Sequence, residues 1–244
     1  MSESVRLLII SASPRANGNS AFLASSVLDD LANLDDVSPI PFAAERYSFA
    51  GKKIGPCIGC LACYKNGGHC VIEDDFEALR QLWIDSDAVL YVFPVYHAGV
   101  PAQLKCFMDR LGNSFYGYYE TGPSRHMKAI GSLSQGGVPM GGQEISNLTV
   151  MLHATMTHSL FVTGDAGHLG CGLVSGAGGN RNAFRGRAES GDPAFAREID
   201  AIQNMVRRLI ETAAILKAGV RALRSVLQRD GHYVPFIERL ETQK

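Results

Sequence analysis

Apolar runs alternate with amphipathic stretches along the first two thirds of the chain. Residues 5–11 (VRLLIIS) and 88–93 (AVLYVF) are continuous apolar runs rich in branched side chains, typical of strands buried on both faces. Weaker runs predict three further strands, at residues 40–47, 129–134 and 160–163. Helical periodicity between the runs predicts four helices, over residues 21–32, 74–85, 101–111 and 143–157.

Strands that alternate with helices predict right-handed βαβ units, and hence a parallel sheet covered on both faces. We therefore expect an α/β fold with a doubly wound, five-stranded parallel sheet. Ligands of such sheets bind at the carboxyl ends of the strands. Stretches rich in Gly, Ser or Pro directly follow three of the predicted strands, and these are the first places to look for a site.

The last third of the chain has a different pattern. Residues 164–192 are Gly-rich and without periodicity, which predicts an irregular loop that is disordered or ordered by a partner, or else acts as a lid. Residues 195–216 predict a long helix, followed by a helical tail to residue 244. We expect a core at residues 1–165, which includes a cysteine loop at 57–70, and an extension at 166–244.

The composition of the chain excludes some classes of binding partner and indicates the cellular compartment. The chain has 23 Lys and Arg against 24 Asp and Glu, a net charge of −1, which argues against a nucleic-acid or acidic-membrane footprint. It has neither a signal-like leader nor an apolar stretch long enough to span a membrane, so we expect a cytoplasmic protein. In that reducing compartment, clustered thiols favour metal or redox chemistry over disulfides.

The loop after the first strand is rich in hydrogen-bond donors. Its polar side chains are Ser13, Arg15, Asn17, Asn19 and Ser20. A phosphate monoester is bound by such donors at a helix N-terminus, although an ordinary strand-to-helix turn has similar residues. The glycine spacing is neither GxGxxG nor GxxxxGKS/T, so neither a dinucleotide nor a nucleoside triphosphate is indicated.

This loop carries a family resemblance. Ser13-Pro14-Arg15 followed by Gly18-Asn19-Ser20 resembles the S-P-R-x-x-G-N-S/T loop of the NADPH-dependent FMN reductase family, a branch of the flavodoxin-like fold. The resemblance implies a flavodoxin-like sheet and a loop that holds the FMN phosphate.

Two later loops continue the resemblance. The segment that begins with Pro94, Val95, Tyr96 and His97 resembles the family's P-V/I-Y-x-x-x-x-P-A-x-L/M-K stretch, which implies a place along the isoalloxazine ring. The segment Ser134, Gln135, Gly136 and Gly137 resembles the third flavin loop, where glycine lets the backbone approach the ring. We also expect the aromatic stretch at 112–119 to lie near the ring mouth, where it shapes the substrate slot or a dimer partner's pocket. Core packing or a hydrophobic loop anchor is the alternative for this stretch.

Four of the six cysteines are crowded into one loop with the spacing C-x2-C-x2-C-x6-C. They are Cys57, Cys60, Cys63 and Cys70. Three thiols so close together with a fourth suit a 4Fe-4S cluster or zinc. The spacing resembles that of the iron–sulfur flavoproteins, a subgroup of the same family, but similar cysteines occur in relatives without a cluster. A cluster, no metal and zinc all stay open.

The resemblance implies an FMN-dependent enzyme that passes electrons from NAD(P)H or ferredoxin to a small acceptor such as a quinone, a nitro or azo compound, or a metal. Because a flavin itself supplies such chemistry, no catalytic side chain is assigned. The family resemblance also implies a homodimer or homotetramer. The alternative is a non-catalytic flavin electron carrier or interaction protein with structural cysteines.

Overall fold

The computed structural model describes residues 4–31, 40–118, 125–165, 167–176 and 180–242. Its centre is a parallel sheet with the order β2-β1-β3-β4-β5, as in flavodoxin-like proteins. The strands are β1 (Val5–Ser11), β2 (Phe42–Ser48), β3 (Ala88–Pro94), β4 (Ala129–Gly136) and β5 (Leu160–Phe161). The predicted doubly wound, five-stranded α/β fold is confirmed.

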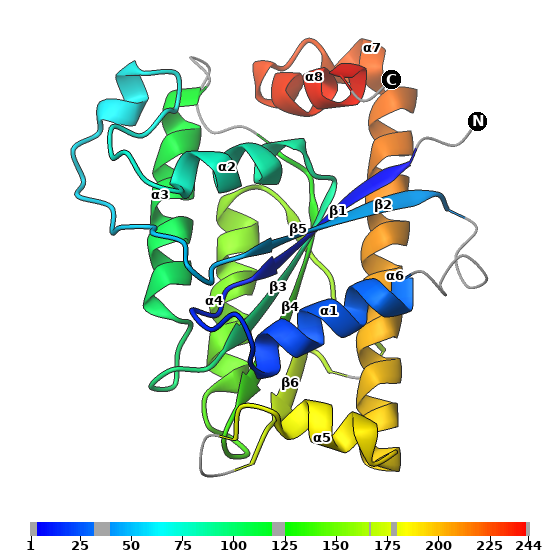
Figure 1. Cartoon of the computed structure of the whole chain (residues 1–244). Helices are drawn as coiled ribbons and strands as arrows, with labels where there is room; N and C mark the ends of the chain where they lie inside the picture. The colour runs from blue at the N-terminus through cyan, green and yellow to red at the C-terminus, as the bar shows by residue number, and fades with distance from the viewer. Residues whose placement is uncertain (1–3, 32–39, 119–124, 166, 177–179, 243–244) are drawn as a thin grey trace.

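Helices cover both faces of the sheet (Figure 1). On one face lie α2 (Phe76–Asp85), α3 (Ala102–Tyr118) and α4 (Gln143–Met156). Their apolar sides pack on alternate strand residues such as Leu8, Val89 and Phe93. On the other face lie α1 (Asn19–Leu31) and the long α6 (Pro193–Ala222), which pack against Leu7, Ile9 and their neighbours. Side chains that alternate between two covered faces explain why β1 and β3 are apolar throughout.

The far edge of the sheet differs from the prediction. The fifth strand position is shared by β5, which pairs with the start of β4, and β6 (Cys171–Val174), which pairs with its end. Gly170 directly precedes β6 and has a φ of +87°. A Cβ added to Gly170 would lie 2.5 Å from Ser132 Oγ, so only glycine fits at this position. The irregular loop predicted for residues 164–192 is therefore wrong at β6 and at α5 (Ala183–Glu189).

The sequence pattern missed β6 because it is four residues long and follows three glycines. Burial of Cys171 raises the pKa of its thiol to about 11. Cys171 is only 7% exposed, although its surroundings in the sequence are Gly-rich. Phe184 and Phe195 stack at 5.7 Å and connect α5 to α6. The division at residue 165 into a core and an extension stays a prediction.

The C-terminal elements pack at the opposite end from α5 (Figure 1). They are α7 (Arg224–Leu227), the 3-10 turn η3 (Gly231–Tyr233) and α8 (Val234–Thr242). Phe236 and Leu240 of α8 pack on Val220 near the end of α6. Arg239 of α8 and Lys217 of α6 both pair with the buried Asp87 carboxylate, which attaches the tail to the start of β3. None of the described helices is long and apolar enough to cross a membrane.

Candidate functional site

Three loops meet at the carboxyl edge of the sheet, as the sequence predicts for a ligand site. They follow β1, β3 and β4 and are joined by hydrogen bonds. The N–H of Val95 donates to Gln135 O at 2.7 Å, and Gln135 Nε2 donates to Ser20 Oγ at 3.3 Å. Residues distant in the sequence therefore form one continuous rim.

The first loop has its ends buried and its middle exposed. Ser13, Asn19 and Ser20 are buried, whereas Arg15 and Asn17 face solvent. Among the described residues, neither Ser11 Oγ nor Asn19 Oδ1 has a hydrogen-bond partner, although both atoms are buried. Buried polar atoms without a partner are uncommon in proteins, and the N-terminus of α1 favours an anion at this end of the loop.

The loop after β3 forms a tight reversal. Tyr96 and Gly99 exchange two backbone hydrogen bonds, at 2.9 and 3.0 Å, while His97 and Ala98 between them have φ of 49° and 60°. These two residues leave their own N–H groups outside the bonds of the turn, where a ring nitrogen or carbonyl oxygen could accept them. Pro94 is buried and Tyr96 is 40% exposed.

The loop after β4 lies directly against that reversal. Gly142 has φ +107, and a Cβ added there would lie 2.4 Å from the Cα of Ala98. Ser134, Gln135 and Gly136 are buried, and Gly137 is exposed. Ser175, just after β6, donates its N–H to Gly136 O at 2.8 Å, so the extension borders this loop.

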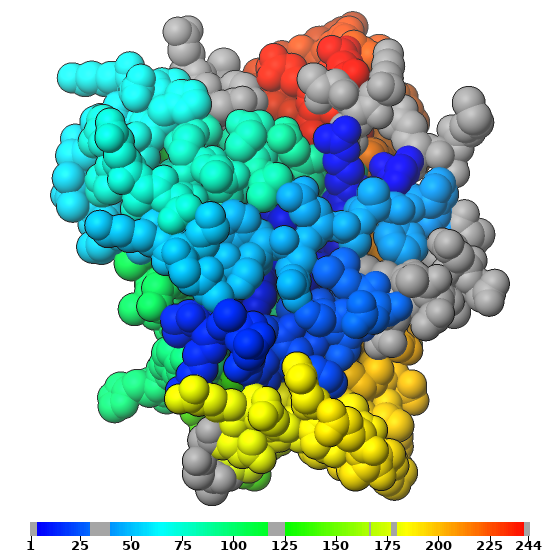
Figure 2. Space-filling view, viewed as in Figure 1, coloured from blue at the N-terminus to red at the C-terminus, as the bar shows by residue number. Residues whose placement is uncertain are grey.

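The extension also reaches the first loop. Asn19 Nδ2 donates to the carbonyl of Asn180 at 2.9 Å. The guanidinium of Arg185 in α5 lies over the ring of Phe22 in α1 at 5.8 Å. Figure 2 shows this segment (yellow) against the first loop (dark blue). Asn180 has no motif around it, and sequence reasoning did not find this contact.

All four predicted cysteines line one small cavity. The cavity lies between the loop that carries the 3-10 turn η2 (Ala62–Lys65) and the C-terminal half of α3. No three His, Cys, Asp or Glu side chains in the described parts of the chain are arranged to hold a metal ion. Four thiols around one space are a donor set that both zinc and an iron–sulfur cluster take, so the residue types fit either group.

Two α3 side chains form the wall opposite the thiols. Asn113 Nδ2 donates to Cys57 Sγ at 3.6 Å, and Asn113 O lies 3.6 Å from Cys63 Sγ. Arg110 is buried beside Cys70 and donates to Asp74 Oδ2 at 2.6 Å and to the Ile72 carbonyl at 3.1 Å. Sequence reasoning assigned neither residue, although a polar pair spaced i, i+3 on an amphipathic helix shares one face.

The electrostatics of this cavity follow from burial and from Arg110. Burial raises the pKa of the Cys63 thiol, and the neighbouring thiols raise it further. Burial also acts to raise the pKa of Asp74, but hydrogen bonds from Arg110 and from the N–H of Gly55 and Phe76 outweigh it and lower that pKa. Asp74 therefore stays ionised and anchors both ends of the cysteine loop.

The cysteine cavity and the edge formed by the three loops lie at opposite ends of α3 (Figure 1). The helix starts beside the β3 loop, and Asn113 lies eleven residues later, roughly 16 Å along the axis at 1.5 Å per residue. The expectation that residues 112–119 border the ring mouth is wrong for the described part of that stretch. Tyr116 contacts Tyr64 of the cysteine loop instead, with ring centroids 6.0 Å apart, and residue 119 lies outside the described residues.

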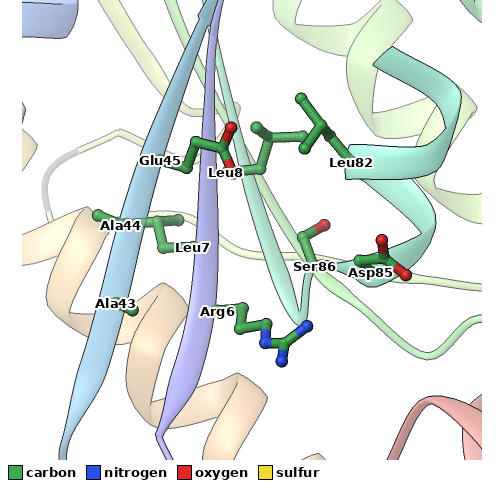
Figure 3. Close-up of a pocket in the computed structure, with 9 residues that line it drawn as sticks. All are labelled: Arg6, Leu7, Leu8, Ala43, Ala44, Glu45, Leu82, Asp85 and Ser86. Carbon is green, nitrogen blue, oxygen red and sulfur yellow. The ribbon is translucent and has the colours of Figure 1, made fainter. Parts of the chain in front are cut away.

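A separate cavity of about 300 Å³ lies near the amino ends of β1 and β2 (Figure 3). Leu8 and Leu82 line it, with the charged side chains of Arg6, Glu45 and Asp85 around them. Cofactors of doubly wound sheets bind at the carboxyl ends of the strands. This cavity therefore lies away from the edge at which such sheets bind their ligands.

The sequence comparisons agree with this arrangement. Residues 5–167 match the profile of the NADPH-dependent FMN reductase family, and the chain belongs to that family. It is thus an enzyme of a flavin-dependent NAD(P)H oxidoreductase family. FMN and NAD(P)H fit this family, and the enzymes of the family act on small acceptor molecules.

Two similar proteins from archaea are named iron–sulfur flavoproteins. An iron–sulfur flavoprotein of Methanocaldococcus jannaschii is 32% identical over 161 residues, which cover 66% of this chain and 77% of the relative. An iron–sulfur flavoprotein of Archaeoglobus fulgidus is 38% identical over 99 residues, which cover 41% of this chain and only 42% of that relative.

Solved structures show the same fold at low identity. A flavone reductase superposes with a TM-score of 0.56 at 15% identity, over 86% of this chain and 63% of its own. An NADH:FMN oxidoreductase superposes with a TM-score of 0.53 at 14% identity, over 87% of this chain and 89% of its own.

Proposed function

We propose that this enzyme binds FMN at the three-loop edge and passes electrons from NAD(P)H or ferredoxin to a small acceptor such as a quinone, a nitro or azo compound, or a metal. We further propose that Cys57, Cys60, Cys63 and Cys70 hold a 4Fe-4S cluster. The observation that carries the proposal is the meeting of the three motif-bearing loops on one rim, with unpartnered buried atoms beside them. A cytoplasmic location and a homodimer or homotetramer belong to the same proposal.

Each loop has a separate task in this proposal. Ser13, Arg15, Asn17 and Ser20 bind the phosphate with the N-terminus of α1, and Asn19 Oδ1 accepts from a ribityl hydroxyl. The N–H groups of the reversal after β3 donate to the ring, while Tyr96 covers it and Pro94 holds the reversal in place. The backbone of residues 134–137 approaches the pyrimidine end. When bound, FMN supplies hydride and single-electron chemistry, so the chain's task is to bind and orient.

The four thiols fit the cluster because they share one cavity with amide and guanidinium donors. When bound, a cluster of this kind supplies one-electron exchange. The names of the two archaeal relatives support the same assignment.

Anaerobic purification tests both parts. The chain is expected to carry FMN and about four irons and four sulfides, and to oxidise NAD(P)H with a quinone or nitro acceptor. Flavin without iron would remove the cluster and leave the flavin enzyme. Exchange with reduced ferredoxin without turnover of any acceptor would favour an electron carrier, and a colourless protein that binds no added FMN would overturn the proposal.

A further inference from the structure

Asn113 contacts two of the four thiols from one position on α3. Its side-chain Nδ2 lies 3.1 Å from the Asp109 carbonyl, one turn earlier, and 3.6 Å from Cys57 Sγ. A carbonyl oxygen only accepts, so Asp109 fixes the amide with its nitrogen toward the sulfur. The two amide hydrogens have two defined acceptors, one on the helix and one in the cysteine cavity.

Arg110 holds the other side of the same cavity. Its guanidinium lies 4.1 Å over the Phe76 ring, and hydrogen bonds to Gly55 O and Ile72 O connect both ends of the cysteine loop to α3. Asp74 balances its charge. Arg110 is also hydrogen-bonded to Cys70, whereas the neutral Asn113 amide is the donor to Cys57.

Hydrogen bonds to the ligand sulfurs are among the factors that set the reduction potential of an iron–sulfur group. A donor stabilises the more negative, reduced state more than the oxidised one. We propose that Asn113 is a positioning residue that raises the electron affinity of the cluster through its N–H···S bond to Cys57. This inference rests on the cluster assignment made above.

Substitution of Asn113 tests the inference, and the readout is the midpoint potential of the cluster in a redox titration followed by electron paramagnetic resonance. Asn113→Ala removes the donor and is expected to lower the equilibrium constant for reduction about tenfold, about 59 mV for one electron. Asn113→Asp places an anion there and is expected to lower it further. Asn113 is only partly buried, so both variants should fold.

Thr149→Ala is the matched control, because Thr149 lines the groove beside Asn113 but not the cysteine cavity. The expected order of potentials is wild type equal to Thr149→Ala, then Asn113→Ala, then Asn113→Asp, at equal iron content. Equal potentials in all four proteins, or a higher potential in Asn113→Asp, would overturn the role of Asn113 alone. Absence of iron from the wild type would overturn the cluster assignment itself, and the inference with it.

Discussion

The edge formed by the loops after β1, β3 and β4, where we propose that FMN binds (the flavin edge), and the cysteine cavity are constructed in different ways. The flavin edge is made by the ends of three strands of one sheet, and backbone groups form much of its rim. The cysteine cavity is made by one long connection between β2 and α2, which is attached to α3 by side chains. The comparison teaches that the first site is positioned by the topology of the fold, whereas the second depends on a few side-chain anchors.

The largest effect that separates the two regions is expected from the cysteines. Ser in place of Cys57, Cys60, Cys63 or Cys70 removes a thiolate ligand and should reduce bound iron tenfold or more, since even changes one shell further out cost 10–100-fold in metal affinity. Bound FMN should stay near the wild-type amount. Iron, sulfide and flavin assays on anaerobically purified protein measure both.

Cys106→Ser is the control, because Cys106 lies on α3 outside the cavity. It should keep its iron. Loss of flavin together with iron in the four variants would show that the two regions are one site and break the comparison.

The second largest effect is expected at the flavin edge, from Gly142→Ala. Its positive φ and the contact of the added Cβ with the Ala98 backbone should cost about 3 kcal/mol of folding free energy. The β3 and β4 loops would have to separate, so FMN affinity should fall while iron is retained. Urea unfolding and a flavin titration measure the two effects.

Gly191→Ala is the matched control for Gly142→Ala. Gly191 also has a positive φ, +67, but a Cβ added there would have nothing within 4 Å. It should show the cost of the positive φ alone, about 1–2 kcal/mol, and normal flavin affinity. Equal losses in both variants would mean that the contact with Ala98 is unimportant.

The sequence predicts the flavin edge more completely than the cysteine cavity. Buried strands at 5–11 and 88–93 can be predicted from their apolar runs, and the carboxyl edge follows from βαβ handedness, so the three loops could be placed together. The cysteines could be found, but Arg110 and Asn113 could not be matched to them. Their contacts depend on how an irregular loop folds back on α3. The strand β6 was missed for a similar reason, because its pairing with β4 is set by tertiary contact.

The third prediction concerns the core shared by both regions. His153 lies on the buried side of α4 and is hydrogen-bonded to Tyr91 Oη at 3.3 Å, and burial lowers its pKa from 6.5 to about 4. The unfolded chain therefore binds the proton more readily, so stability is full above pH 6.5 and falls as the pH drops toward 4. The loss from this group at pH 5 is about 2 kcal/mol.

Urea unfolding between pH 7 and pH 5 measures that slope. Buried His126, whose pKa also lies well below its usual value, adds to it in the same direction. His153→Gln should flatten the dependence by the contribution of one proton. If the two regions unfold together as one cooperative unit, flavin release and cluster loss should follow the same pH curve. Two separate curves would show that the two regions unfold independently.

The smallest effect is expected from Arg15→Gln, which tests the phosphate assignment. Arg15 is exposed, so its charge-assisted bonds to a phosphate should contribute about 1.4 kcal/mol, a tenfold change in FMN affinity. Riboflavin lacks the phosphate and should bind wild type and variant equally. Arg6→Ala removes an exposed cation at the other end of β1 and should change neither affinity. A parallel loss for FMN and riboflavin would place Arg15 at the ring rather than at the phosphate, and reverse the orientation of the flavin along this edge.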